Sequence, residues 1–191
     1  MFMRHTLIRF CCVFAITFVL SGLINAQDEL SFAVKTSPSV EFNFTTVNQY
    51  LTGATVSNAI TLNIESDVQW DLYVGTQTDE PGFWNEISTY SIHGDKPPVS
   101  ILQMRVRNLS NTSLVSGFVP LSDITDPVYI IGSEAEDFPV NCPDQGTNAP
   151  GSYLVNPNCY RFSIDLRVVP GFDYKAGLYS LTIQYVLVED L

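Results

Sequence analysis

The chain has 191 residues, of which 46% are hydrophobic, and its 20 acidic side chains outnumber nine basic ones, giving a formal net charge of −11 at pH 7. A surface this acidic repels the phosphates of nucleic acids and of anionic lipids, which argues against both as partners. The length fits one domain that buries a core of its own.

Residues 1–26 have the three parts of a secretory signal peptide. Arg4 and Arg9 supply the positive start, residues 10–23 a short apolar run, and residues 24–26 (Ile-Asn-Ala) a small-residue cleavage site. A membrane anchor, the alternative, needs about 20 apolar residues, and polar residues interrupt this run too early. We therefore expect export and a mature protein that is secreted, periplasmic or on the cell surface, without membrane insertion after cleavage.

The mature chain, residues 27–191, then holds 191 − 26 = 165 residues in a single domain. The signal segment takes two of the nine basic residues and none of the acidic ones, so the mature formal charge is 7 − 20 = −13. Cys142 and Cys159 remain, and export exposes them to an oxidising compartment. We expect a disulfide between them, worth about 3 kcal/mol for a loop of this size. Two free thiols or a metal pair are the alternatives.

Apolar and polar residues alternate with a period of two in several short segments, which is typical of half-buried β-strands. In chain order these segments are residues 30–35, 40–45, 60–65, 68–74 and 101–107, two less regular ones at 114–119 and 128–131, and finally 160–168 and 179–187. We interpret the last two as an antiparallel hairpin against which the earlier strands pack. No window has a helical apolar stripe with helix caps.

This pattern predicts an all-β fold, a single antiparallel β-sandwich of Ig-like or pilin-like type. Two long loops are expected, at residues 75–98 and 131–158, where glycines, prolines and acidic residues gather. One shared core is expected to contain the inward-facing residues of the best strands, which are Trp70, Phe162, Ile164, Leu166, Leu181, Ile183 and Tyr185.

Tyr179 follows Gly177 closely and begins the last predicted strand. A tyrosine in such a place can form a tyrosine corner, in which its hydroxyl bonds back to the preceding connection. The acceptor would then lie within residues 170–175. The alternative is an ordinary core aromatic whose hydroxyl reaches water.

The sequence predicts no catalytic set, no metal site and no cofactor. His93 is the mature chain's one histidine, and we interpret it as an exposed loop residue. Acidic residues gather at Asp79-Glu80 and at Glu134, Glu136 and Asp137. Paired carboxylates can hydrolyse glycosides and loop carboxylates can bind Ca²⁺, but solvated loop acids are the commoner case.

Phe83, Trp84 and Tyr90 stand among polar residues in the first long loop. Aromatic side chains in such a loop can stack on sugar rings or anchor a partner protein. They can equally tuck beneath the loop as a satellite of the core. These three residues are the candidate ligand-binding residues of the sequence.

Two motifs resemble those of exported bacterial domains. Trp70-Asp71-Leu72 is similar to the Trp-x-Leu of WxL surface domains, and residues 179–187 (YSLTIQYVL) are similar to that family's second motif, with Tyr185 at the position of its Trp. Residues 176–179 (AGLY) resemble the start of the last strand in pilin-like and spore-coat-U-like secreted domains. The resemblance implies an exported Ig-like or pilin-like sandwich, associated with cell-wall attachment in the first family and with surface fibres in the second.

The expected function is that of an exported, non-catalytic surface protein with a structural or adhesive role, whose partner is a cell-surface protein or a glycan. A module that binds cell-wall or other glycans is the alternative. A third hypothesis is that the protein is a hydrolase that uses loop carboxylates.

Overall fold

We analysed a computed structural model of the chain, which describes residues 30–36, 39–108, 117–132 and 148–190. The predicted signal peptide lies outside these residues. The described part contains no helix that is both long and apolar enough to cross a membrane.

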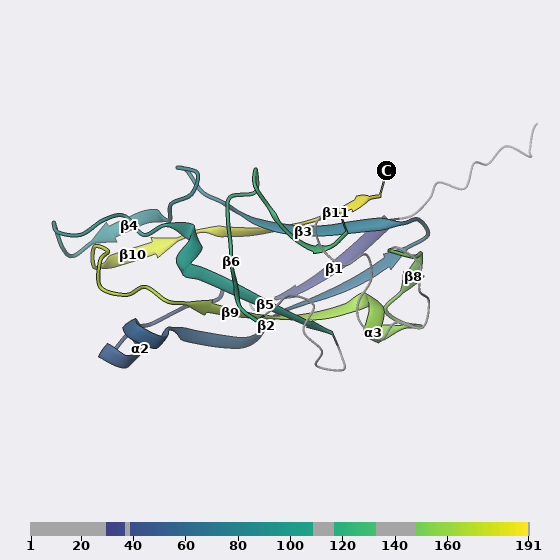
Figure 1. Cartoon of the computed structure of the whole chain (residues 1–191), viewed down its shortest axis with the longest axis horizontal. Coiled ribbons are helices and arrows are strands. Elements are labelled where there is room, and N and C mark those ends of the chain that lie inside the picture. Colours follow the sequence, from purple (N-terminus) through teal and green to yellow (C-terminus); the bar gives the residue numbers. More distant parts are fainter. Residues whose placement is uncertain (1–29, 37–38, 109–116, 133–147, 191) are drawn as a thin grey trace, which may run out of the picture.

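The regular structure of the described chain is mostly antiparallel β-strand, which confirms the predicted all-β class (Figure 1). The six-stranded sheet has the order β1 (Leu30–Thr36), β2 (Ala54–Ser66), β9 (Arg161–Val168), β5 (Leu102–Asn108), β6 (Val119–Pro120), and β8 (Gly151–Ser152) also pairs with β2. The three-stranded sheet has the order β11 (Thr182–Glu189), β3 (Trp70–Gln77), β7 (Val128–Ile131), and a two-stranded ribbon pairs β10 (Gly177–Ser180) with β4 (Asn85–Thr89). The Ig-like or pilin-like sandwich topology stays a prediction.

The ribbon prolongs the three-stranded sheet. Thr182 at the start of β11 pairs with Gln77 at the end of β3, while Ser180 at the end of β10 pairs with Asn85 at the start of β4. Figure 1 shows these four strands together in one layer, with β2, β5 and β9 in the other.

One hydrophobic core joins the two layers. Trp70 is 1% exposed, and its ring lies 6.0 Å from that of Tyr160 and 6.4 Å from that of Phe162. Of the seven predicted core residues, Trp70, Phe162, Ile164 and Leu166 are buried, whereas Leu181, Ile183 and Tyr185 are half-buried and pack against the same cluster. The prediction that all seven residues share one core is therefore confirmed, and the three residues at positions 181–185 lie at the margin of that core.

The predicted C-terminal hairpin is wrong. β9 lies between β2 and β5, and β11 pairs with β3 instead of β9. Residues 169–176 carry the chain from one layer to the other. The physical reason is that a period of two determines which face of a strand is buried, but it does not select the neighbouring strand.

Residues 40–45 form no strand, although their side chains alternate between half-buried and exposed as predicted. The predicted loop at residues 75–98 contains β4, and the predicted strand at residues 114–119 contributes only the start of β6 within the described chain. Most of the second predicted loop, residues 133–147, lies outside the described residues, and what remains includes β8 and a short helix.

Two short helices and one 3₁₀ turn complete the described chain, at α2 (Val47–Thr52), α3 (Pro157–Tyr160) and η1 (Val99–Ile101). α2 starts at a capping box, in which the Thr46 side chain accepts a hydrogen bond from the Gln49 backbone and the Gln49 side chain bonds back to Thr46. A helix of six residues is too short to present an apolar stripe, which explains why the sequence pattern missed it.

Candidate functional site

A cleft of about 1220 Å³ opens between the two layers of the fold. One wall is the continuous segment of residues 39–44, and the other is residues 174–185, which include β10 and the start of β11. Core side chains of the six-stranded sheet complete the lining, among them Ile60, Leu166 and Val168. The cleft therefore lies between two extended stretches of chain that come from opposite ends of the sequence.

Residues 39–44 form an extended wall whose apolar side chains face the core. Val40, Phe42 and Phe44 are half-buried against the core cluster, and the residues between them are exposed. Within the described chain, this segment makes no backbone hydrogen bond to a neighbouring strand. It therefore packs like a strand, but its backbone polar groups have no backbone partner among the described residues.

Aromatic rings connect this wall to the mouth of the cleft. The ring of Tyr50 on α2 lies 5.3 Å from that of Phe44 and stacks on Phe172 at 5.4 Å, with 17° between the two planes. Gly53 ends α2 with a φ of 86°, and a Cβ there would lie 2.7 Å from Val169. Only glycine fits both the positive φ and this close approach, so Gly53 fixes how α2 sits beside the cleft.

Tyr179 on β10 belongs to the opposite wall, and its hydroxyl donates a hydrogen bond to the Lys175 carbonyl at 2.9 Å. The acceptor lies within the predicted range, so the tyrosine-corner hypothesis is confirmed. Burial raises the pKa of Tyr179, the charge of Glu86 raises it further, and the charge of Lys96 opposes the shift. Gly177 lies beneath the ring, where a Cβ would come within 3.0 Å of it.

Tyr185 on β11 also belongs to this wall and differs from Tyr179 in the state of its hydroxyl. Its hydroxyl oxygen is buried and makes no hydrogen bond within the part of the chain that the structure describes. Burial raises the pKa of Tyr185 well above its usual range, so the hydroxyl stays protonated and remains a donor at any physiological pH. A buried polar group without a partner is unusual in a folded protein and calls for an explanation.

The three aromatic residues singled out in the sequence do not form one site. Trp84 is half-buried, lines the cleft and donates its indole N–H to the Pro98 carbonyl at 3.1 Å. Phe83 and Tyr90 are 37% and 76% exposed and do not line the cleft. The satellite-core interpretation therefore holds for Trp84, while Tyr90 remains a surface aromatic.

The predicted titratable candidates are dispersed. His93 is exposed in its loop, as expected, and so are Asp79 and Glu80, of which Glu80 forms an ion pair with Lys96 at 2.6 Å. In the ranges that the structure describes, no three His, Cys, Asp or Glu side chains lie together as a metal site would need. The second acidic group, at residues 134–137, falls outside those ranges.

Cys159 is buried, with 5% of its surface exposed, at the end of α3. Its predicted partner, Cys142, lies outside the described residues. The disulfide therefore stays a prediction.

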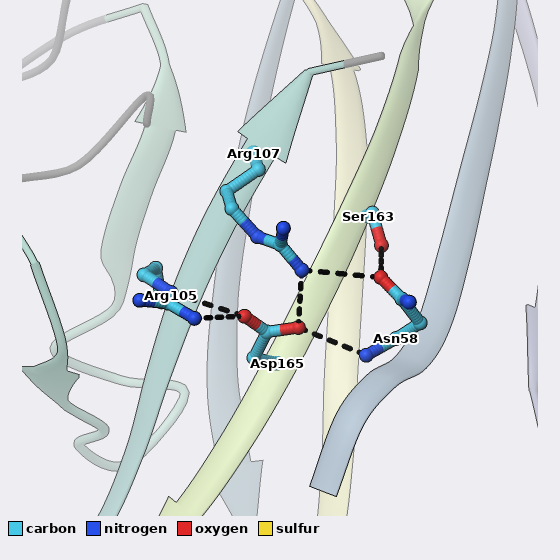
Figure 2. A network of polar contacts seen from close by, with 5 residues as sticks. All are labelled: Asn58, Arg105, Arg107, Ser163 and Asp165. Carbon is cyan, nitrogen blue, oxygen red and sulfur yellow. Dashed lines mark hydrogen bonds and ion pairs between the residues drawn. The ribbon is translucent and has the colours of Figure 1, made fainter. Parts of the chain in front are cut away.

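The sequence pattern missed a buried polar network on the outer face of the six-stranded sheet (Figure 2). Alternation places Asp165 on β9, and Arg105 and Arg107 on β5, on the strand faces that point away from the core, yet the Asp165 side chain is fully buried. Its two oxygens accept hydrogen bonds from Arg105 Nη2 at 2.6 Å, Arg107 Nη2 at 2.7 Å and the Asn58 backbone N–H at 2.8 Å. The pairing register of β5 with β9 places Arg105 opposite Asp165, and this register could not be predicted from the sequence alone.

Burial by itself would raise the pKa of Asp165, but the hydrogen bonds from Asn58, Arg105 and Arg107 outweigh it and lower that pKa below its usual value. Asn58 has a φ of 51° and lies where the pairing of β2 with β9 shifts register. Its side-chain oxygen accepts hydrogen bonds from Arg107 and Ser163 at 3.1 and 2.6 Å. The network thus links β5, β9 and the bulge in β2.

No protein-family model matches the chain, and a search of curated proteins finds no match either. Trp70 and Leu72, which carry the first WxL-like motif, are both buried in the core. The resemblance to WxL and pilin-like domains stays a prediction.

Proposed function

We propose that this chain is an exported, non-catalytic surface protein with a structural or adhesive role, and that its cleft holds an extended apolar segment of a partner protein. The observation that carries the proposal is one aromatic cleft between two extended walls. Residues 39–44 make no backbone hydrogen bond to a strand of the described chain, and β10 and β11 of the other wall each pair there on one edge only. Export is supported by the signal-peptide pattern of residues 1–26.

The backbone edges favour a strand-like occupant. β11 pairs with β3 and β10 with β4, and within the described chain neither has a ladder partner on its other edge. The wall of residues 39–44 has none on either side. A sheet edge of this kind presents a row of free N–H and C=O groups to which an extended peptide can add as a further strand.

The side chains favour an occupant with an apolar inward row. The lining of the cleft includes Phe42, Phe44, Trp84, Ile183 and Tyr185, all half-buried against the core. Burial of apolar side chains supplies affinity at about 25 cal/mol per Å² removed from water. Backbone pairing and alternate apolar side chains together describe a β-strand.

Exposed apolar residues continue the surface beyond the cleft. Val47 and Leu51 on α2 are 67% and 61% exposed beside the Tyr50–Phe172 stack, and Phe172 itself is 60% exposed. Exposed apolar surface next to a groove is typical of a protein-binding site.

A glycan is the second candidate occupant, because the stacked rings of Tyr50 and Phe172 present aromatic faces at the cleft mouth. Aromatic faces of this kind can stack on sugar rings. Binding of chito-oligosaccharides, which share the N-acetylglucosamine unit of cell walls, separates this candidate from the peptide.

We also propose that Cys142 and Cys159 form a disulfide in the exported protein. The proposal is supported by the predicted oxidising compartment and by the absence of any other cysteine from the mature sequence.

Trp84 provides an intrinsic reporter for the test. The chain has two tryptophans, of which Trp70 is buried at 1% exposure and Trp84 lines the cleft. We would titrate the mature protein with a synthetic decapeptide that alternates Val and Phe with Ser and Gln, and follow the tryptophan emission. A Trp84→Phe variant, which should lose the signal, shows that the change arises in the cleft.

Two matched peptides make the test specific. One has the same residues grouped in blocks, and the other is N-methylated at alternate residues, which keeps the side chains but removes half of the backbone donors. We expect both to bind at least about tenfold more weakly than the alternating peptide, a difference of about 1.4 kcal/mol. Equal binding of all three would refute strand addition, and chito-oligosaccharide binding without peptide binding would favour the glycan candidate.

A further inference from the structure

The unpartnered hydroxyl of Tyr185 has an explanation in the occupant of the cleft. We propose that this hydroxyl is the polar anchor of the cleft, and that the bound segment carries a hydrogen-bond acceptor, such as a Thr, Ser or Asn side-chain oxygen, at one position of its otherwise apolar inward row. The inference deepens the proposed function and rests on it for the identity of the occupant.

A comparison of two of the three tyrosines of this wall provides the argument. Tyr179 and Tyr185 both line the cleft, but the Tyr179 hydroxyl is satisfied by Lys175 within the protein, whereas the Tyr185 hydroxyl is buried without a partner. Leaving a buried donor unsatisfied costs free energy, which a phenylalanine at the same position would avoid. A cost of this kind in the free protein is recovered when a ligand supplies the missing acceptor.

The position of the group makes such a contact accessible. Tyr185 as a residue is half-buried and lines the cleft, while its hydroxyl oxygen is itself buried from solvent. The phenolic O–H bond can rotate about the C–O axis without any movement of the ring. An acceptor in the cleft stabilises the rotamer that turns the hydroxyl toward it.

The chemistry of the group specifies an acceptor on the ligand. Burial keeps the phenol protonated, so Tyr185 donates. Leu181 and Ile183, which precede Tyr185 on the same face of the chain, have no side-chain acceptor to compete for this hydroxyl. An apolar pocket with one placed polar group is the usual form of a selective binding site, because the polar group discriminates between occupants of the same shape.

The first arm of the experiment uses the ligand-free protein. Tyr185→Phe removes a hydroxyl that has no partner, so its denaturation midpoint should equal or exceed that of the parent. Tyr179→Phe removes a hydroxyl that is bonded, so its midpoint should fall. If Tyr185→Phe lowers the midpoint as much as Tyr179→Phe does, the hydroxyl is already satisfied in the free protein and the inference is overturned.

The second arm uses two fragments of matched shape, acetophenone, which has a carbonyl acceptor, and α-methylstyrene, which has a methylene group in its place. Binding is followed by NMR of ring-labelled tyrosines. We expect acetophenone to bind the parent about three- to tenfold more tightly, and Tyr185→Phe to lose this preference. Tyr129→Phe, on β7 and outside the cleft, serves as the control that keeps it.

The third arm connects the anchor to the peptide. Each inward Val of the alternating decapeptide is replaced in turn by Thr, which has the same shape and adds an acceptor oxygen. One position should bind the parent about three- to tenfold more tightly than its Val counterpart, and this gain should vanish in Tyr185→Phe.

These arms distinguish the inference from the proposed function. If the fragments behave as expected and no peptide binds, the peptide-binding function is refuted and the anchor stands. If the parent shows no preference for acetophenone, binds neither fragment, or keeps the preference in Tyr185→Phe, the anchor is refuted whatever the peptides do.

Discussion

Replacing Asp165 by Asn should be among the most destabilising changes in the described chain, although this residue lies outside the hydrophobic core. The two carboxylate oxygens accept hydrogen bonds from the guanidinium groups of Arg105 and Arg107 and from the Asn58 backbone. Asparagine offers one oxygen in place of two, and its amide N–H₂ group would face a donor. The variant therefore loses the negative charge and at least one pair of charge-assisted bonds.

The size of the effect follows from the burial of each partner. Breaking a buried ion pair by removing one partner costs about 3–5 kcal/mol. The Asp165 side chain is fully buried, but those of Arg105 and Arg107 are 35% and 20% exposed, so water compensates part of the loss. We therefore expect a decrease of about 2–4 kcal/mol in the free energy of unfolding.

The pH dependence supplies an independent check. The folded-state pKa of Asp165 is lowered from its ordinary value of 3.8, so the stabilisation is fully present above that value and is lost as the pH falls through the lower folded-state pKa. The difference between the parent and Asp165→Asn should therefore be constant from neutral pH to about pH 5 and shrink below pH 4.

The assay is urea denaturation of the mature protein at pH 7, 5 and 3, with Asp173→Asn as the matched control because Asp173 is exposed. A difference below about 0.5 kcal/mol at pH 7, the usual size of a surface substitution, would refute the reasoning. So would a large difference that stays unchanged down to pH 3.

Two further substitutions and one thiol titration test the rest of the fold. Tyr179→Phe should lower stability by about 0.5–1.5 kcal/mol, because it removes the bond to Lys175 but keeps the ring; an unchanged denaturation midpoint would contradict the tyrosine corner. Ile183→Ala should cost about 1–3 kcal/mol, less than the 2–5 typical of full burial because Ile183 is half-buried, and a change below half a kcal/mol would place it outside the core. The exported protein should show no free thiol under native conditions, and titration of Cys142 or Cys159 without reductant would disprove their disulfide.

The sequence predicted well what depends on the period of side chains along a strand. The buried faces of β2, β3, β5 and β9 follow from alternation, because a strand that packs on one core must place its apolar residues on one side. The Tyr179 hydrogen bond was likewise predictable, since its donor and acceptor are four residues apart.

What the sequence could not provide is which segments lie side by side. The partners of β9 and β11 depend on long-range register, which alternation leaves open. The cleft illustrates the consequence, because its walls come from residues 39–44 and 174–185 and none of its residues is exceptional in isolation. The sequence singled out Trp84 because it is an aromatic residue in a polar loop. It placed Tyr185 in the core, but no feature of the sequence predicted that the Tyr185 hydroxyl would lack a partner among the described residues.

The polar network and the cleft occupy opposite faces of the same strands. Asp165 points outward from β9, while the next residue, Leu166, lines the cleft together with Ile60, which follows the bulge in β2. The Asn58 N–H that bonds to Asp165 lies in this bulge, in a left-handed conformation that asparagine tolerates better than most residues.

Loss of the Asp165 acceptor should therefore release the bulge before it unfolds the sheet. In native-state hydrogen exchange, Asp165→Asn should accelerate exchange of the Asn58 amide more than the drop in global stability requires, while β3, in the other sheet, should change only by the global amount. Uniform acceleration in β2 and β3 would mean that the network stabilises the whole fold without holding the bulge, and that another contact positions Ile60 in the cleft.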